Sequence, residues 1–327
     1  MKHIKVYLLI LIASLLIFSI SCEKVINLNI EDAKIKIVLN GIISSDSAVI
    51  VHISKSRHIL DNAQISFLSD AQVKLYENET EIGTMIHIGN GFYKINYTPK
   101  KGFDYKVAVS HSNYDDAYAT TRVLNSVQII SIDTFTTYGQ YQDNNLNFNL
   151  KFTDPIDEKN YYMLTLINNF YEMQYSDTVK NIDTLYVGPD TTIVYITYGG
   201  YVRTPRRMFV FPNTEDVIIE SQLQKGLVFS DELINGKTYT LRFNTSYYNF
   251  WGDTNRVYVQ LKSIPKELYL YYKSLQQYYN NHGDPFSEPV MVYTNVVNGL
   301  GIFSSQSIHS DSLVFINTNN QVYYYDK

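Results

Sequence analysis

Short β-type runs separated by turn residues fill the chain from residue 34 onward, and they constrain its fold more than any other feature. In residues 35–43 and 48–54, apolar and polar side chains alternate, which is typical of strands with one buried face. Turn signals such as Gly89-Asn90-Gly91 follow one another at the spacing of β-sandwiches and barrels. We therefore expect a mainly β protein.

The runs divide into two predicted domains. Residues 34–125, with residues 81–88 as one of the strands, favour an immunoglobulin-like or transthyretin-like β-sandwich. Residues 126–327 predict a second β-rich domain, with a long hairpin over 171–210. Further strands are expected in this second domain at residues 217–219, 290–292, 301–303, 313–316 and 322–325.

One helix is expected within the second domain, at about residues 265–281. Pro265 suits the first helical position, and Glu267 lies in the first turn, where the helix dipole favours an acid. Leucines and tyrosines then recur at helical spacing until Asn281, which is followed by a fitting stop.

The N-terminus has a short basic segment, an unbroken apolar run over residues 6–18 and small residues before Cys22. This pattern predicts a secretory signal peptide over residues 1–21, since a membrane span needs about 20 apolar residues. Residues 19–22 resemble a bacterial lipobox, in which the cysteine is acylated and becomes the mature N-terminus. Cys22 is the single cysteine of the chain, so we expect it to carry the lipid, with residues 22–33 as a tether. The alternatives are an ordinary signal peptide with an incidental cysteine and an uncleaved anchor.

Asp-Ser/Thr-apolar tripeptides recur along the chain. They resemble the sites that Bacteroidetes glycosylate on exported proteins, and such a modification is bulky and lies on the surface. The candidate acceptors are Ser47, Thr178, Thr184, Thr191 and Ser312. The alternative is that Asp-Thr pairs simply begin strands after turns.

Composition and motifs argue against nucleic-acid binding, metal binding and catalysis. A net charge of −5 leaves no basic footprint for nucleic acid, and the seven histidines are scattered. Gly236-Lys237-Thr238 lacks the first glycine of a phosphate loop, and no Gly-x-Ser-x-Gly motif is present. We read Asp231 as an acceptor of backbone N–H groups at a turn, with a ligand or calcium oxygen as the alternative. No catalytic residue, metal or cofactor is predicted.

Tyrosine is the most suggestive residue type, with 30 copies, most of which lie in the second domain. Its large rigid ring with a polar tip suits protein interfaces and ligand stacking, although most copies are expected to pack on the sheets. Contacts with a ligand or partner are predicted at two places, which are Tyr198 with Tyr201 and a loop carrying Tyr247, Tyr248 and Trp251.

Several ordered motifs resemble a known family. They are residues 22–26, 71–75 leading to 91–93, 229–233 before 235–237, and 298–303. Together they look like the Bacteroidetes lipoproteins grouped as the domain-of-unknown-function 4249 family. Such families are typically encoded beside TonB-dependent outer-membrane receptors. The resemblance implies an accessory lipoprotein of an uptake system, anchored to outer-membrane lipid through Cys22, with such a receptor as its partner. The alternatives are a structural or adhesive surface protein and a hydrolase acting on glycan or peptide.

Overall fold

The computed structural model describes residues 34–57, 64, 66–138, 144–156, 158–188, 191–246, 250, 254–281, 287–288, 290–318 and 321–325, without the side chains of 179–198 and 317–325. The predicted signal peptide, Cys22 and most of the tether lie outside these residues. Contacts between residues divide the chain into two units, Met1–Lys34 and Ile35–Lys327. All the strands and the helix described below lie in the second unit.

The protein is mainly β, as its alternating pattern predicts. The strands of its first part are β1 (Ile37–Ser44), β2 (Val49–Lys55), β3 (Gln72–Glu77), β4 (Thr80–Thr84), β5 (Ile86–Gly89), β6 (Phe92–Ile95), β7 (Asp104–His111) and β8 (Tyr114–Arg122). The later elements are β9 (Ile129–Thr137), β10 (Asn145–Thr153), β11 (Tyr161–Gly188), β12 (Thr191–Val210), β13 (Ile219–Leu223), β14 (Gly226–Ser230), β15 (Thr238–Ser246), β16 (Thr254–Ile264), α2 (Lys266–Asn281), β17 (Leu300–Thr318) and β18 (Gln321–Tyr325).

Helix α2 confirms the helix expected from Pro265 and Glu267. Pro265 comes immediately before the first helical residue, and Glu267 lies in the first turn. Leu268 and Tyr269 are buried against the sheet, so the apolar stripe of the helix faces the core. Within the described residues, no helix is both long enough and apolar enough to cross a membrane.

Two sheets enclose the first hydrophobic core. One is β4-β3-β7-β8, and the other is the β1-β2-β6-β5 part of a larger sheet. Alternate side chains of both sheets meet between them, among them Leu39, Val51, Val73 and Val107, each at most 1% exposed. This two-layer arrangement agrees with the β-sandwich expected for residues 34–125.

The second core lies between the sheet β9-β10-β15 and the β14-β11-β16-β17 part of the larger sheet. Phe148 of β10 and Phe243 of β15 stack with ring centroids 4.9 Å apart, and Phe315 of β17 meets Phe148 edge-on. Because every second residue of these strands points inward, their other side chains form an outer polar face.

Strand β17 contributes to both cores. Its first part pairs in parallel with β1, from Val38↔Leu300 onward, and its later part pairs antiparallel with β16. Phe303 lies in the first core and Phe315 in the second, both without exposed surface. A late segment of the chain therefore completes the first core. The division into domains at residues 34–125 and 126–327 stays a prediction.

The structure departs from the predicted strands at four places. Residues 301–303 and 313–316, expected as two strands, belong to the one continuous strand β17. Residues 81–88 form two strands in different sheets, because buried Met85 lies between them and its N–H donates to the Val73 carbonyl. The strand expected at 217–219 begins only at Ile219, since the Asp216 carboxylate accepts the Ile218 N–H and closes a turn. Residues 290–292 are not a strand, and next to them the Tyr293 N–H donates to Ser274 Oγ of α2.

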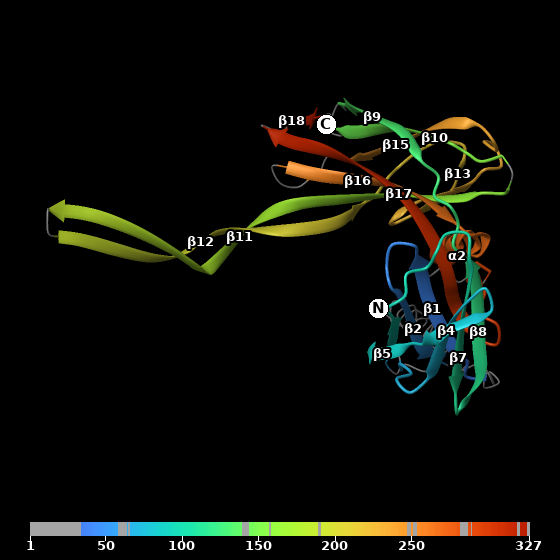
Figure 1. The fold of residues 1–327 in the computed structure, drawn as a ribbon. Helices are drawn as coiled ribbons and strands as arrows, with labels where there is room; N and C mark the ends of the chain where they lie inside the picture. Colours follow the sequence, from blue (N-terminus) through green and yellow to red (C-terminus); the bar gives the residue numbers. More distant parts are fainter. Residues whose placement is uncertain are drawn as a thin grey trace, which may run out of the picture. The chain divides into compact units, whose positions relative to one another are not determined.

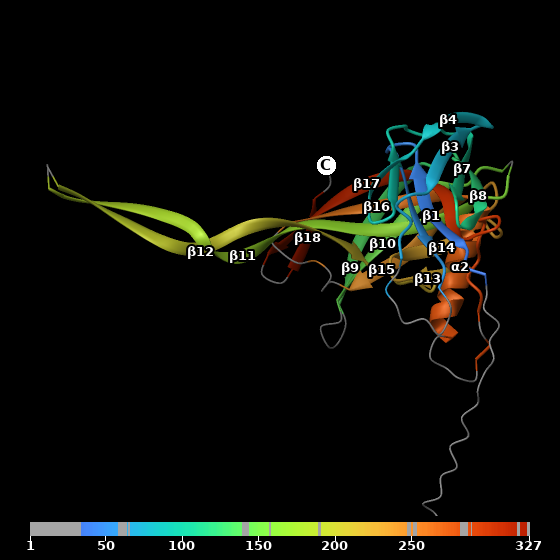
Figure 2. The same cartoon turned by 90° about the horizontal axis from the view of Figure 1, so that it is seen from below.

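Strands β11 and β12 confirm the hairpin predicted for residues 171–210. They pair with each other from Leu166↔Val210 to Gly188↔Thr191. Strand β16 accompanies β11 only as far as Phe170↔Asn255. Beyond that pair, β11 and β12 continue side by side as a two-stranded ribbon (Figures 1 and 2).

Candidate functional site

One face of the ribbon gathers large apolar and aromatic side chains. Tyr171, Met173 and Tyr175 alternate along β11, and Tyr201 of β12 lies directly opposite Tyr175. These four side chains are 53–68% exposed, and the rings of Tyr175 and Tyr201 meet edge-on with centroids 5.7 Å apart. We refer to these four residues as the aromatic face.

The opposite face of the ribbon is polar and internally hydrogen-bonded. Gln174 donates to Glu172 at 3.2 Å, and Thr204 donates to Gln174 at 3.3 Å. Arg206 Nε donates to the same Glu172 carboxylate at 2.7 Å. The polar side chains on this face therefore form hydrogen bonds with one another, whereas the rings of the aromatic face remain exposed to solvent.

Gly199 explains how Tyr175 can lie across the ribbon. The backbone of Gly199 has a φ of 107°, which other residues rarely adopt. A Cβ at this position would meet the Tyr175 hydroxyl at 2.1 Å. The pair Gly199-Gly200 in the sequence is therefore the local signal for this ring position.

A pocket of about 540 Å³ lies where the ribbon leaves the sheet. Its described lining is Asn169, Phe170, Tyr171, Pro205, Arg206, Arg207, Thr254, Arg256 and Tyr258. Three of these residues are arginines, and no acid is among them. We refer to this site as the arginine pocket.

The arginines of the pocket differ in their partners. Arg206 is paired with Glu172, but Arg207 and Arg256 have no ion pair with a carboxylate within the described part of the chain. The register places Arg207, Asn169 and Arg256 side by side on three neighbouring strands. The Oδ1 atom of Asn169 is buried there, and it has no hydrogen-bond partner among the residues that the structure describes.

Lys262 adds another cation to the same face of the sheet. It follows Arg256 on β16 at an even spacing, so both side chains leave the strand on one side. Its side chain is 9% exposed. Burial, together with the nearby charge of Arg207, lowers the pKa of Lys262 to about 8. Positive charge is therefore concentrated on this face.

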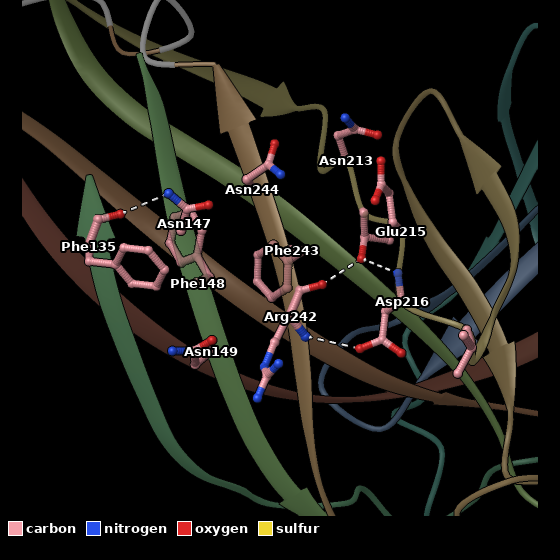
Figure 3. A pocket seen from close by; sticks show the side chains of 12 residues that line it. Phe135, Asn147, Phe148, Asn149, Asn213, Glu215, Asp216, Arg242, Phe243 and Asn244 are labelled. Atoms are coloured by element: carbon pink, nitrogen blue, oxygen red, sulfur yellow. Dashed lines mark hydrogen bonds between the residues drawn. The ribbon is translucent and has the colours of Figure 1, made fainter. Parts of the chain in front are cut away.

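A second pocket, of about 640 Å³, lies on the sheet β9-β10-β15 (Figure 3). It is lined by Phe135, Asn147, Phe148, Asn149, Asn213, Thr214, Glu215, Asp216, Val217, Arg242, Phe243 and Asn244. Four of these residues carry carboxamides, which offer both donors and an acceptor. We refer to this site as the amide pocket.

Asp216 of the amide pocket holds the neighbouring loop in place. It accepts hydrogen bonds from the Tyr239 hydroxyl at 2.6 Å and from the backbone N–H of Arg242 at 3.3 Å. The Arg242 guanidinium extends away from this carboxylate (Figure 3). Burial, and then the bond to Asp216, raises the pKa of Tyr239 to about 12. The Asp216 carboxylate therefore stabilises the fold through these bonds. The remaining lining of the amide pocket does not indicate a particular class of ligand.

Asp231 has the structural role favoured by its sequence context. Its Oδ2 accepts the Asn160 N–H at 2.7 Å, its Oδ1 lies 3.2 Å from Lys159 Nζ, and its side chain is almost fully buried. Within the described residues, no three His, Cys, Asp or Glu side chains are placed to hold a metal ion.

A family model described as a domain of unknown function, DUF4249, matches residues 23–312. The chain belongs to this family. No curated protein sequence matches it. The DUF4249 match covers the ribbon, both pockets, the first hydrophobic core and all of the second core except Leu313 and Phe315.

The predicted contact tyrosines of the DUF4249 chain divide into two groups. Tyr201 lies on the aromatic face, 68% exposed, and the backbone of Tyr198 pairs with Lys180 in the ribbon. The side chain of Tyr198 and all of Tyr247, Tyr248 and Trp251 lie outside the described residues. Their role in binding stays a prediction.

The glycosylation candidates of the DUF4249 chain occupy different settings. Ser47 is exposed beside β2, Thr178 is exposed in the ribbon, and Ser312 is half-buried in β17. Thr184 and Thr191 lie on ribbon strands, but their side chains are outside the described part. Modification at these positions stays a prediction.

Sequence reasoning missed the arginine pocket of the DUF4249 chain. Arg206-Arg207 and Arg256 are far apart in the sequence and meet through the pairing of β12, β11 and β16. The available signal was the grouping of Arg203, Arg206 and Arg207 on one segment of an otherwise acidic chain.

Proposed function

We propose that this protein is a non-catalytic accessory lipoprotein of a TonB-dependent uptake system, and that it docks to a protein partner through its aromatic face. The observation that carries the proposal is the exposure of Tyr171, Met173, Tyr175 and Tyr201 on one face of the ribbon. Tyr and Met are enriched where proteins bury one another, and large exposed apolar patches mark interaction sites.

The isolation of the ribbon supports this role. Past Phe170, β11 pairs with β12 alone among the described strands, so no third described strand extends the ribbon at either edge. Two strands by themselves are marginally stable in water and gain from a partner that buries one side. A protein surface laid on the aromatic face would supply that burial.

The membrane anchor rests on the sequence. The single cysteine, Cys22, follows a signal-like segment at the lipobox position, and acylation there would fix the protein to the outer membrane. A protein anchored in this way can bind a partner that lies in the same membrane. The implied partner is a TonB-dependent receptor, which the family resemblance leads us to expect in a neighbouring gene.

Co-purification of the full-length protein with the neighbouring receptor tests the proposal. We expect Tyr175→Ser combined with Tyr201→Ser to reduce receptor recovery by about tenfold or more, since buried aromatic residues dominate interface energies. Gln174→Ala, on the polar face of the same ribbon, is the matched control and should retain the receptor. Equal recovery with the double variant would reject this role for the aromatic face.

The unpaired edges of the ribbon favour one other function, a structural or adhesive surface protein. Exposed strand edges can pair with further copies of a chain. Such a protein should form polymers in detergent solution, and shortening the ribbon should abolish them. A monodisperse protein that still recovers the receptor favours the accessory role.

A further inference from the structure

We propose that the arginine pocket is a binding site for the carboxylate or phosphate group of an anionic ligand. This inference does not depend on the docking of a receptor. It rests on the charge of the lining, the rigidity of the strands that carry it, and the polar atoms left without partners.

The lining has cations that lack anions. Arg207 and Arg256 lie on either side of Asn169 in the sheet, and neither has a carboxylate partner among the described residues. The whole chain has a net charge of −5, so acids are plentiful elsewhere. Arginine side chains form bidentate hydrogen bonds with carboxylate and phosphate oxygens. Arg207 and Arg256 together are therefore suited to bind one anionic group.

The strand register fixes the backbone positions of the two arginines on one face of the sheet. Arg207 is directly opposite Asn169 on β11, and Asn169 is directly opposite Arg256 on β16. Arg206, on the same stretch of β12, is already held by Glu172 at 2.7 Å. An anion would therefore meet Arg207 and Arg256 on the same face, and it would order their exposed side chains on binding.

The surroundings increase the attraction for an anion. Lys262 is nine-tenths buried on the same face, and the positive charge of Arg207 acts on it. Lys262 lies six residues beyond Arg256 on β16, so it adds to the positive potential of this face without lining the pocket.

The remaining lining fits an organic ligand. Tyr171 and Tyr258 present aromatic surface, and buried Asn169 Oδ1 is an acceptor without a partner that a ligand N–H or O–H group can satisfy. A volume of about 540 Å³ is within the range of small-molecule sites. The preferred ligand therefore combines an anionic group with a donor and an apolar part.

Calorimetric titration of the full-length protein in detergent at low salt tests the site. The probes are glutarate, inorganic phosphate, a hexaglutamate peptide and uncharged glutaramide. We expect at least one of the three anions to bind and glutaramide not to bind. Tighter binding of hexaglutamate would show that the anionic group belongs to an acidic peptide chain. Tighter binding of glutarate or phosphate would show that it belongs to a free solute.

Variants make the result specific to the pocket. Arg207→Gln with Arg256→Gln should weaken anion binding by about tenfold or more, because it removes both charged groups that donate hydrogen bonds to the anion. Arg207→Lys, which keeps the positive charge, should weaken anion binding less than the double variant does. Arg122→Gln is the control, since it removes an exposed arginine paired with Asp104 elsewhere. Absence of binding by all three anions, or unchanged binding in a correctly folded double variant, overturns the proposal.

Discussion

Glu220 of β13 joins the helix to the sheet and shows what one side chain contributes at this junction. Its Oε1 accepts hydrogen bonds from Ser230 N–H at 3.0 Å and Ser230 Oγ at 2.6 Å. Its Oε2 lies 2.8 Å from Lys273 Nζ and accepts the Tyr269 hydroxyl, both from α2. Burial by itself raises the pKa of Glu220, but the bonds from Lys273, Ser230 and Tyr269 outweigh it and lower the pKa to about 2.

This lowered pKa predicts a loss of stability in acid. The unfolded chain takes up a proton at Glu220 near pH 4.5, whereas the folded protein does so only near pH 2. The stabilisation by ionised Glu220 is therefore complete above pH 4.5 and is lost as the pH falls towards 2. We expect Glu220→Gln to lower the free energy of unfolding at pH 7 by about 2 kcal/mol and to flatten its pH dependence below pH 4.5.

Urea denaturation at pH 7 and pH 3 measures both effects. Glu232→Gln is the matched control, because Glu232 is exposed in the turn after β14. An unchanged pH dependence in Glu220→Gln would contradict this account of the helix contact.

At the scale of elements, the ribbon is separable from the rest of the fold. Its strand pairing past Phe170 involves β11 and β12 alone, and Glu172 lies directly opposite Thr204. A two-residue Asn-Gly turn can connect such an opposed pair. The body of the protein therefore retains its sheets and cores when residues 173–203 are replaced.

We expect replacement of residues 173–203 by Asn-Gly to shift Tm by less than about 4 °C, because both hydrophobic cores are left intact. Thermal unfolding followed by circular dichroism measures the shift. The same variant should fail to recover the receptor. Loss of a cooperative transition would show that the ribbon supports the body.

Elements with one buried face could be predicted from the sequence, and elements fixed by distant contacts could not. Alternation located β1, β2 and β10, and Pro265 with Glu267 located α2. No Pro, Asn or Asp marks the change of sheet at Met85, so residues 81–88 suggest one strand. The arginine pocket depends on the register of three strands, which sequence spacing does not specify.

At the scale of the whole molecule, β17 connects the two hydrophobic cores. Phe303 fills the first core and Phe315 the second, on one continuous strand. Backbone contact is close at Gly301, where a Cβ would meet the Leu39 carbonyl oxygen at 2.2 Å. The first core thus depends on residues near the end of the chain.

We expect Phe303→Ala to lower the free energy of unfolding by about 3–5 kcal/mol, through lost burial and the cavity left behind. Leu300→Ala, on the same strand but 38% exposed, should cost much less. Guanidinium denaturation of the two variants compares them directly. Similar losses would show that β17 does not fill the first core as described.

The parallel pairing of β1 with β17 also affects the order of folding during synthesis. The ribosome releases β1 early, but its neighbour begins at Leu300 of a 327-residue chain. One edge of the nascent sandwich therefore stays unpaired until almost all of the polypeptide has emerged, and closing so long a loop is slow. A chaperone that shields this edge would protect the unfinished protein from aggregation.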